Sequence, residues 1–255
     1  MKIFSKNLLL VFFILASGSI VYGQDISRSA KIILTDAFNH WRGNTSSGKI
    51  TMIIHRRNWE RSMTIEVFSK GEPLSLVRVI APKKDRGNAT LVNDRNMWTF
   101  SSKVNRIIKV PSSMMSQGWM GSDFSNKDIA RTNEILDQYN HSLLNQWTEN
   151  NFEVFEIQLL PYEDAPVVWG KQVLKVRSDN VLLEQNYYDQ EFKLVKTMKT
   201  LEIAKMGGRS LAVRQRMSKV DKPDEWTDIV IDSMIFDINL EDSVFTLSNL
   251  RNPRL

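Results

Sequence analysis

The side chains that could carry catalysis or hold a metal are few in this sequence and widely spaced. The chain has three histidines, His40, His55 and His141, and no cysteine. A zinc site needs His, Cys or carboxylate ligands at defined spacings, and no two of these histidines have such a spacing. We therefore predict no metal, no cofactor, no thiol nucleophile and no disulfide.

One short run could supply a nucleophile or an acid–base pair. Ser122 lies in the sequence Gly-Ser-Asp, which lacks the second glycine and the strand-to-helix setting of a nucleophile elbow. Asp123 and Asp128 could act as acid and base only if burial separated their pKa values. Ser125 and Asp128 instead match a capping box that opens a helix. We expect no enzyme here, and a Ser122-dependent enzyme on acyl or sugar substrates is the weaker alternative.

The ends and the bulk composition indicate one globular domain behind a targeting segment. The chain has 255 residues, of which 42% are hydrophobic and 25% charged. Lys2 and Lys6 precede an apolar run over residues 8–16, and small residues follow near residue 23, as in a signal peptide. We predict a signal peptide over residues 1–23 and a single domain over residues 24–255. Cleavage after Gly18, or retention of the segment as an anchor, stays open, although the run is short for a bilayer span.

The charge balance argues against nucleic acid as a partner. Removing Lys2 and Lys6 lowers the formal net charge from +5 to +3, which is weak for a chain that would neutralise a phosphate backbone. The basic groups near residues 56–61, 83–86 and 214–219 could meet anionic head groups at a membrane surface. We expect at most transient contact with a membrane.

Two periodicities divide the rest of the chain. Apolar residues recur at steps of three and four over residues 25–41, ending at Gly43, which predicts an amphipathic helix that packs on a sheet. From residue 49 the period is two, and turn residues separate the strands, which predicts an antiparallel meander. A second helix is predicted over residues 128–144, and strands resume from residue 152.

Residues 97–128 are the stretch around which the other elements are organised. A strand ends at Pro111, and residues 112–125 then combine methionine, tryptophan and phenylalanine with serine and glycine. Flexible thioethers and aromatic rings suit a surface that repacks around a variable apolar guest. Residues 112–125 are therefore a candidate lid over an apolar site.

This stretch resembles the outer-membrane lipoprotein-sorting family, the LolA-like periplasmic carriers. The resemblance is carried by residues 106–111 (RIIKVP), 120–124 (MGSDF) and 127–129 (KDI), with further likeness at 81–98 and in a closing strand at 242–247. It implies an α+β, mainly antiparallel fold: an incomplete, strongly curved half-barrel of about 10–12 strands with two or three helices packed against it.

The resemblance also implies a function. It points to a monomeric periplasmic carrier that binds the acyl chains of a lipoprotein or lipid and moves them toward the outer membrane, with an RND-type exporter of the inner membrane as a possible partner. A periplasmic module that senses lipid or lipoprotein is the alternative. Candidate lining and lid residues are Met52, Ile54, Met63, Ile65, Val67, Trp98, Phe100, Met114, Met115, Trp119, Met120 and Phe124.

Overall fold

The computed structural model describes residues 29–72, 74–130 and 134–253. The predicted signal peptide lies outside the described residues. None of the described helices is long and apolar enough to cross a membrane.

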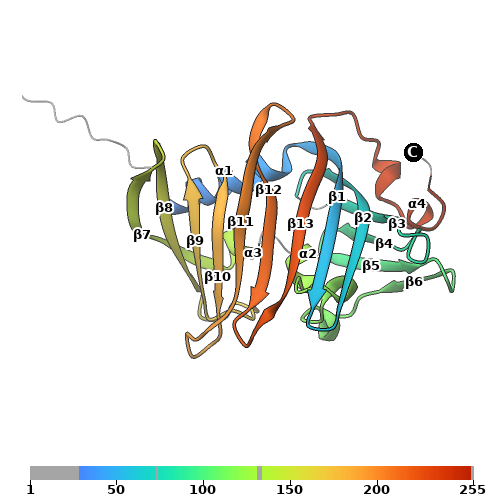
Figure 1. Ribbon diagram of the computed structural model, residues 1–255, viewed down its shortest axis with the longest axis horizontal. Coiled ribbons are helices and arrows are strands. Elements are labelled where there is room, and N and C mark those ends of the chain that lie inside the picture. The colour runs from blue at the N-terminus through green and yellow to red at the C-terminus, as the bar shows by residue number, and fades with distance from the viewer. Residues whose placement is uncertain (1–28, 73, 131–133, 254–255) are drawn as a thin grey trace, which may run out of the picture.

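Thirteen strands form one antiparallel sheet in the order β6-β5-β4-β3-β2-β1-β13-β12-β11-β10-β9-β8-β7. Figure 1 shows that the sheet is strongly bent, with α1 crossing one side of it. The strands are β1 Thr45–Arg56, β2 Trp59–Lys70, β3 Leu74–Ala81, β4 Ala89–Asn93, β5 Asn96–Ser101, β6 Arg106–Lys109, β7 Tyr139–Glu149, β8 Phe152–Pro161, β9 Lys171–Arg177, β10 Leu182–Tyr188, β11 Leu194–Met206, β12 Arg209–Lys219 and β13 Lys222–Phe236. The sheet is open because β6 and β7 do not pair with each other, so the predicted half-barrel is confirmed, with 13 strands instead of 10–12.

The described part of the chain contains four short α-helices and three 3-10 helices. They are α1 Ala30–Arg42, η1 Ser112–Met114, η2 Trp119–Gly121, α2 Asn126–Ala130, α3 Glu134–Asp137, η3 Asp242–Phe245 and α4 Leu247–Arg251.

Helix α1 (Ala30–Arg42) confirms the predicted helix over residues 25–41, of which residues 25–28 lie outside the described residues and Ser29 is the N-cap. The Ser29 hydroxyl accepts a hydrogen bond from the Ile32 N–H at the N-terminus, and Gly43 ends the helix at a φ of 67°. Positive φ is a conformation that glycine adopts without a Cβ penalty. The buried face of α1 packs with side chains of β8 and β9, and Ile33 and Leu34 are almost fully buried there. Burying each of these side chains contributes about 1.5–3 kcal/mol.

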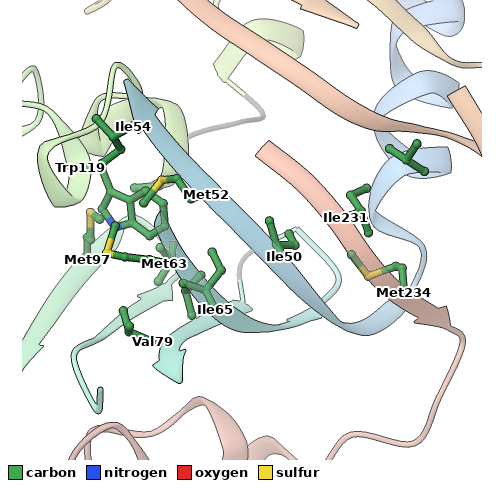
Figure 2. Close-up of a cluster of buried hydrophobic side chains, with 14 of the residues drawn as sticks. Ile50, Met52, Ile54, Met63, Ile65, Val79, Met97, Trp119, Ile231 and Met234 are labelled. Atoms are coloured by element: carbon green, nitrogen blue, oxygen red, sulfur yellow. The ribbon is translucent and has the colours of Figure 1, made fainter. Parts of the chain in front are cut away.

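A second cluster fills the concave face where β1, β2 and β13 meet. Residues 111–130 lie over it, and we call this segment the plug. Figure 2 shows Trp119 of the plug beside Met52, Met63 and Met97. Trp119 is only 3% exposed, and its indole N–H donates to Thr90 Oγ1 at 3.0 Å. The segment expected to be a lid is therefore packed into the sheet.

The opposite face of β3–β5 is covered by the C-terminal segment. Val244, Phe245 and Leu250 pack on Leu76 and Phe100, and this segment lies beside β3 and β4 in Figure 1. The expected closing strand at residues 242–247 was wrong: these residues form η3 and the start of α4. Val244 and Phe245 are buried against an outer sheet face, which a helical turn achieves as well as a strand, whereas Leu247 is exposed.

The second predicted helix was too long. Helical residues are α2 and α3, and the chain already enters β7 at Tyr139, where residues 139–144 had been assigned to the helix. Most side chains of β7 are exposed because β7 is an edge strand. An edge strand that buries little on either face shows no clear alternation, so its period was not visible in the sequence.

Candidate functional site

An apolar cavity of about 300 Å³ lies between the concave sheet face, α1 and the plug. Side chains from both halves of the chain border it: Leu34, Ala37, Phe38, Trp41, Ile50, Ile65, Val67, Val77, Trp119, Phe124, Ile129, Val181, Leu182, Tyr187, Met198, Leu211, Ala212 and Ile229. Polar residues border it as well, namely His40, Arg42, Asp128, Asn180, Gln185, Ser210 and Gln215. Its volume is at the lower end of the range for small-molecule sites.

The structure divides the predicted lining residues into three groups. Ile65, Val67, Trp119 and Phe124 border the cavity. Met52, Ile54, Met63 and Met115 are buried in the cluster under the plug, and Met120 packs against that cluster. Trp98 and Phe100 face the C-terminal segment on the other side of the sheet, and Met114 is 39% exposed.

The register of β1 and β2 explains why some of the predicted residues border the cavity while others lie under the plug. Met52 pairs with Met63 near the plug, whereas Ile50 pairs with Ile65 further along the same strands. The plug covers the first pair, and the second pair lies beyond it and borders the cavity. Apolar alternation placed all four on one face but carried no information on where the plug would lie.

Sequence reasoning missed the contribution of α1 and of β10–β13. The stripe of α1 was assigned only to packing, yet Leu34, Ala37 and Phe38 border the cavity. Leu211 and Ile229 also border it, from β12 and β13. The alternation of apolar and polar residues in β12 and β13 could have indicated this contribution. It gives each strand an apolar face, and no packing partner was predicted for that face.

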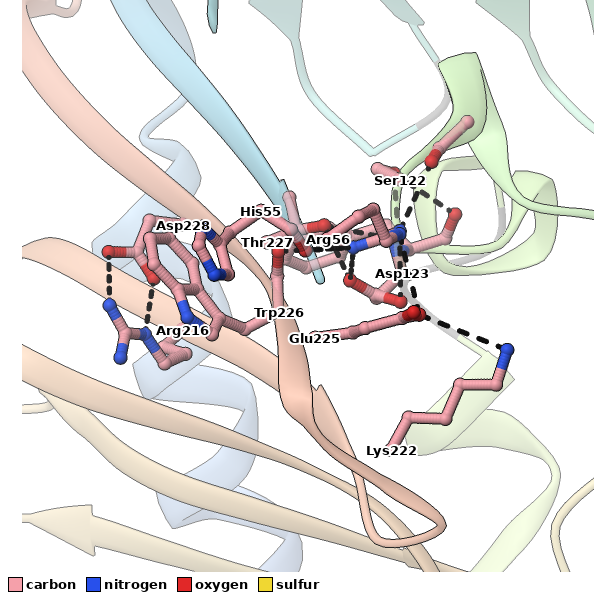
Figure 3. Close-up of polar contacts among 12 residues, drawn as sticks. His55, Arg56, Ser122, Asp123, Arg216, Lys222, Glu225, Trp226, Thr227 and Asp228 are labelled. Atoms are coloured by element: carbon pink, nitrogen blue, oxygen red, sulfur yellow. Dashed lines mark hydrogen bonds and ion pairs between the residues drawn. The ribbon is translucent and has the colours of Figure 1, made fainter. Parts of the chain in front are cut away.

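An ion pair fastens the plug to the ends of β1 and β13. Arg56 donates from Nη1 to Asp123 Oδ2 at 3.0 Å and from Nη2 to Asp123 Oδ1 at 3.2 Å. The Thr227 hydroxyl donates to the same carboxylate at 2.7 Å, and Figure 3 shows the three side chains converging. The Asp123 side chain is 5% exposed. Asp123, which the sequence offered only as half of an acid–base pair, thus holds the plug in place.

A second ion pair lies deeper, at the start of α2. Lys196 donates to Asp128 Oδ2 at 2.6 Å, and its ammonium lies 4.4 Å from the ring centre of Tyr187. The Ser125 N–H donates to Asp128 Oδ2 and the Asp128 N–H donates to Ser125 Oγ, so the predicted capping box is confirmed. Burial raises the pKa of Tyr187 well above its ordinary value, and the nearby Asp128 charge acts in the same direction.

The groups considered for catalysis have structural partners. The Ser122 hydroxyl donates to the carbonyl of Trp119 at 2.7 Å and accepts from the Phe124 N–H, which folds the plug back on itself. His55 stacks on Trp226, and His40 contacts the Ser210 carbonyl at 2.7 Å. Across residues 29–72, 74–130 and 134–253, no group of three metal-ligating side chains is placed to hold a metal.

The basic groups singled out in the sequence are largely paired. Arg214 and Arg216 both donate to Asp228, whose side chain is fully buried. Arg216 also lies 3.7 Å from the ring of Trp226. Arg61 pairs with Asp85 at 3.1 Å. These contacts reduce the charge that such groups could offer to anionic head groups.

Solved structures with this fold are known. A DUF1329 family protein from Desulfovibrio piger matches with a TM-score of 0.78 and 22% identity over 87% of this chain and 97% of that one. A putative outer membrane lipoprotein-sorting protein domain from Vibrio parahaemolyticus matches with a TM-score of 0.76 and 19% identity over 88% and 98%. A LolA superfamily protein from Nitrosomonas europaea gives 0.70 and 23% over 86% and 98%. At these sequence identities, the matches show that the chains share a fold.

Sequence comparison adds the family. No curated protein matches this chain. A family model described as "-like: Uncharacterized protein" matches residues 71–252, which is most of the chain and includes the plug and the eleven strands β3–β13. The chain therefore belongs to this family, and its fold is that of the LolA-like lipoprotein-sorting proteins, as the resemblance implied.

Proposed function

We propose that the protein is a periplasmic carrier that takes acyl chains of a lipoprotein or lipid into its cavity for transfer toward the outer membrane. The observation that carries this proposal is the apolar cavity between α1, the plug and the concave sheet face. Its lining comes from elements far apart in the chain, so the space is formed by the whole fold.

The energetics of such a site suit a reversible carrier. Burying one acyl methylene contributes about 0.8 kcal/mol, so about eight buried methylenes contribute about 6 kcal/mol. Part of this free energy offsets the cost of association, which is at least about 4 kcal/mol. The remaining affinity allows cargo to be passed on without a covalent step.

The donor and the route of export are further parts of the proposal. We expect residues 1–23 to direct the chain across the inner membrane and to be removed. We also expect an RND-type exporter of the inner membrane to supply the cargo, and the likeness of residues 106–111 and 120–124 to the longer LolA-like proteins supports this. Transfer to acceptor vesicles separates a carrier from a lipid-sensing module, because a sensor keeps its ligand.

The first experiment is native mass spectrometry of the protein purified from its own periplasm, followed by organic extraction. A co-purifying acylated species is expected. An empty protein that also takes up no fluorescent fatty acid from solution would overturn the proposal.

Two neighbouring residues of β13 give a matched pair of variants. Ile229 borders the cavity, whereas the side chain of Val230 points to the opposite sheet face because strand side chains alternate. Ile229→Trp fills the cavity and is expected to weaken binding of a fluorescent fatty acid by at least about tenfold, the loss of about two buried methylenes. Val230→Trp is expected to leave binding unchanged. Equal binding by both variants would remove this cavity as the site.

A further inference from the structure

A small side cavity of about 90 Å³ adjoins the main one. Phe38, Asp128, Gln185 and Tyr187 border both cavities. The side cavity is further enclosed by residues of α2, α3, β7, β9 and the loop before β9, most of them polar or aromatic: Lys127, Glu134, Ile135, Tyr139, Trp169 and Gln172. An apolar cavity thus opens toward a small polar one, which is the shape of a site for an amphiphile.

Two buried amides line this side cavity. Gln185 and Gln172 are 7% and 4% exposed, and Gln185 Nε2 donates to Gln172 Oε1 at 2.8 Å. Gln172 also hydrogen-bonds Tyr139, whose hydroxyl donates weakly to the Trp169 carbonyl at 3.4 Å. Within the described part of the chain, no hydrogen bond reaches Gln185 Oε1. Gln185 borders both cavities, so a ligand group placed there can supply the hydrogen bond to this oxygen that the protein does not.

The orientation of the two amides restricts the ligand chemistry. Oxygen and nitrogen of a glutamine amide exchange places when the whole hydrogen-bond chain is reversed. The free atom of Gln185 is then a donor instead of an acceptor. A hydroxyl or a secondary amide can bind in either case because each of them both donates and accepts.

Charged groups around the side cavity balance each other. Asp128 Oδ2 accepts hydrogen bonds from the Lys196 ammonium at 2.6 Å and from the Ser125 N–H at 2.7 Å. Lys127 pairs with Glu134 at 2.8 Å. Among the described residues, Lys196 and Lys127 thus pair with Asp128 and Glu134, and a charged head group would lose its hydration without gaining an unpaired counter-charge from these four groups.

We infer that the side cavity holds the uncharged head of the acyl ligand and that the Gln185 amide atom not bonded to Gln172 binds a hydroxyl or amide of that head. This inference rests on the proposed function, because it assigns the polar end of the chain that the main cavity would hold. The same chemistry occurs in a monoacylglycerol and in the acylated amine of a lipoprotein terminus.

A series of dodecanoyl probes tests the head group, with binding measured by displacement of a fluorescent fatty acid at pH 8. Monododecanoylglycerol and an N-dodecanoyl dipeptide amide are expected to bind about tenfold more tightly than methyl dodecanoate, which donates no hydrogen bond. Dodecanoate and dodecyltrimethylammonium are expected to bind less tightly than the two neutral donors. A preference between the two donors identifies the lipid or the lipopeptide as the source.

Variants of Gln185 separate head recognition from chain binding. Gln185→Leu is expected to abolish the preference for monododecanoylglycerol over methyl dodecanoate while methyl dodecanoate still binds. Gln215→Leu is the matched control, since Gln215 borders the main cavity but not the side cavity, and it is expected to keep the preference. Gln185→Glu adds a carboxylate and is expected to strengthen binding of dodecylammonium several-fold, a gain that an unfolded variant cannot show.

The outcomes distinguish this inference from the proposed function. If every probe binds with the same affinity to the wild type, the acyl site stands and the head-group inference is wrong. If no probe binds, the proposed function itself fails. An unchanged preference in Gln185→Leu would also overturn the assignment of Gln185.

Discussion

Asp123 is the residue on which the position of the plug most depends. Its carboxylate accepts from Arg56 and from the Thr227 hydroxyl, and its own N–H donates to that hydroxyl at 3.1 Å. The plug is thereby tied to β1 and to β13 at one point. The sequence singled out Asp123 as a candidate but did not indicate its partners. They lie 67 and 104 residues away in the chain, and no local pattern predicts such a pairing.

Removing this carboxylate should be strongly destabilising. Asp123→Ala removes the carboxylate that the mostly buried Arg56 guanidinium binds through two hydrogen bonds and leaves Glu225 at 3.7 Å as a more distant counter-charge, so we expect the free energy of unfolding to fall by about 3 kcal/mol. Urea denaturation of the variant and of Arg56→Met, combined with the double variant, measures the coupling between the two side chains.

The adjacent pair Arg57–Asp224 provides the control. Its atoms are 3.8 Å apart and both side chains are more than 70% exposed. Asp224→Ala is therefore expected to change stability by no more than about 0.5 kcal/mol. A similar loss in Asp123→Ala and Asp224→Ala would mean that the plug does not depend on the buried pair.

Among the elements, strands with a clear apolar alternation or a clear stop signal were predictable, and the edge strand β7 was not. The other edge strand, β6, ends at Lys109, just before Pro111, as the sequence predicted. β7 was assigned in part to a helix because Ile135, Leu136 and Tyr139 recur at helical spacing, yet Tyr139 already begins the strand. All three side chains are buried in the same cluster under α1. The first two belong to α3 and the third to β7.

The junction between α3 and β7 should respond to pH through His141. Its ring Nε2 contacts the Ile135 carbonyl at 2.8 Å, and burial lowers the pKa of His141 below its ordinary value of 6.5, with the Lys31 charge acting in the same direction and the hydrogen bond and Asp137 opposing it. The unfolded state then binds the proton more strongly than the folded state. This contribution to stability is complete above about pH 6.5 and is lost as the pH falls through the folded pKa.

Thermal unfolding at pH 7.5 and pH 5.5 measures this effect. The melting temperature of the wild type is expected to fall further between these values than that of His141→Gln, whose amide can still donate to the Ile135 carbonyl. Carboxylates titrate in both proteins, so the difference between the two isolates the histidine. Parallel changes in the two proteins would show that His141 does not contribute.

At the scale of the whole molecule, the sheet consists of two meanders joined at one seam. Strands β1–β6 and β7–β13 each pair with their chain neighbours, and β1 pairs with β13 to unite them. The Thr51 hydroxyl donates across this seam to Asp232, 181 residues further on. Alternation and turn chemistry predicted the meanders, whereas the seam and the cavity above it depend on tertiary contacts that the sequence does not display.

Gly48 is required at the seam. A Cβ on this residue would lie 2.3 Å from the Ser233 carbonyl oxygen and 2.8 Å from the Met234 sulfur, next to the bulge at Lys49. Gly48→Ala must displace backbone atoms, so we expect a loss of about 3 kcal/mol in urea denaturation.

Gly208 is the comparison for that variant. It lies in the β11–β12 turn at a φ of 82°, and a Cβ there meets nothing within 4 Å. Gly208→Ala should cost only the backbone strain of about 1 kcal/mol. A smaller loss for Gly48→Ala than for Gly208→Ala would show that the seam relaxes around the added methyl group.

The strand order has a mechanical consequence. The chain leaves the sheet at one edge strand, β6, and re-enters it at the other, β7, and the plug between them lies over the concave face. A guest larger than the cavity of about 300 Å³ would have to displace the plug or straighten the sheet. If the sheet straightens, the curvature at its two edges reports whether the cavity is full, and a protein that binds either edge would sense an occupied cavity without touching the guest.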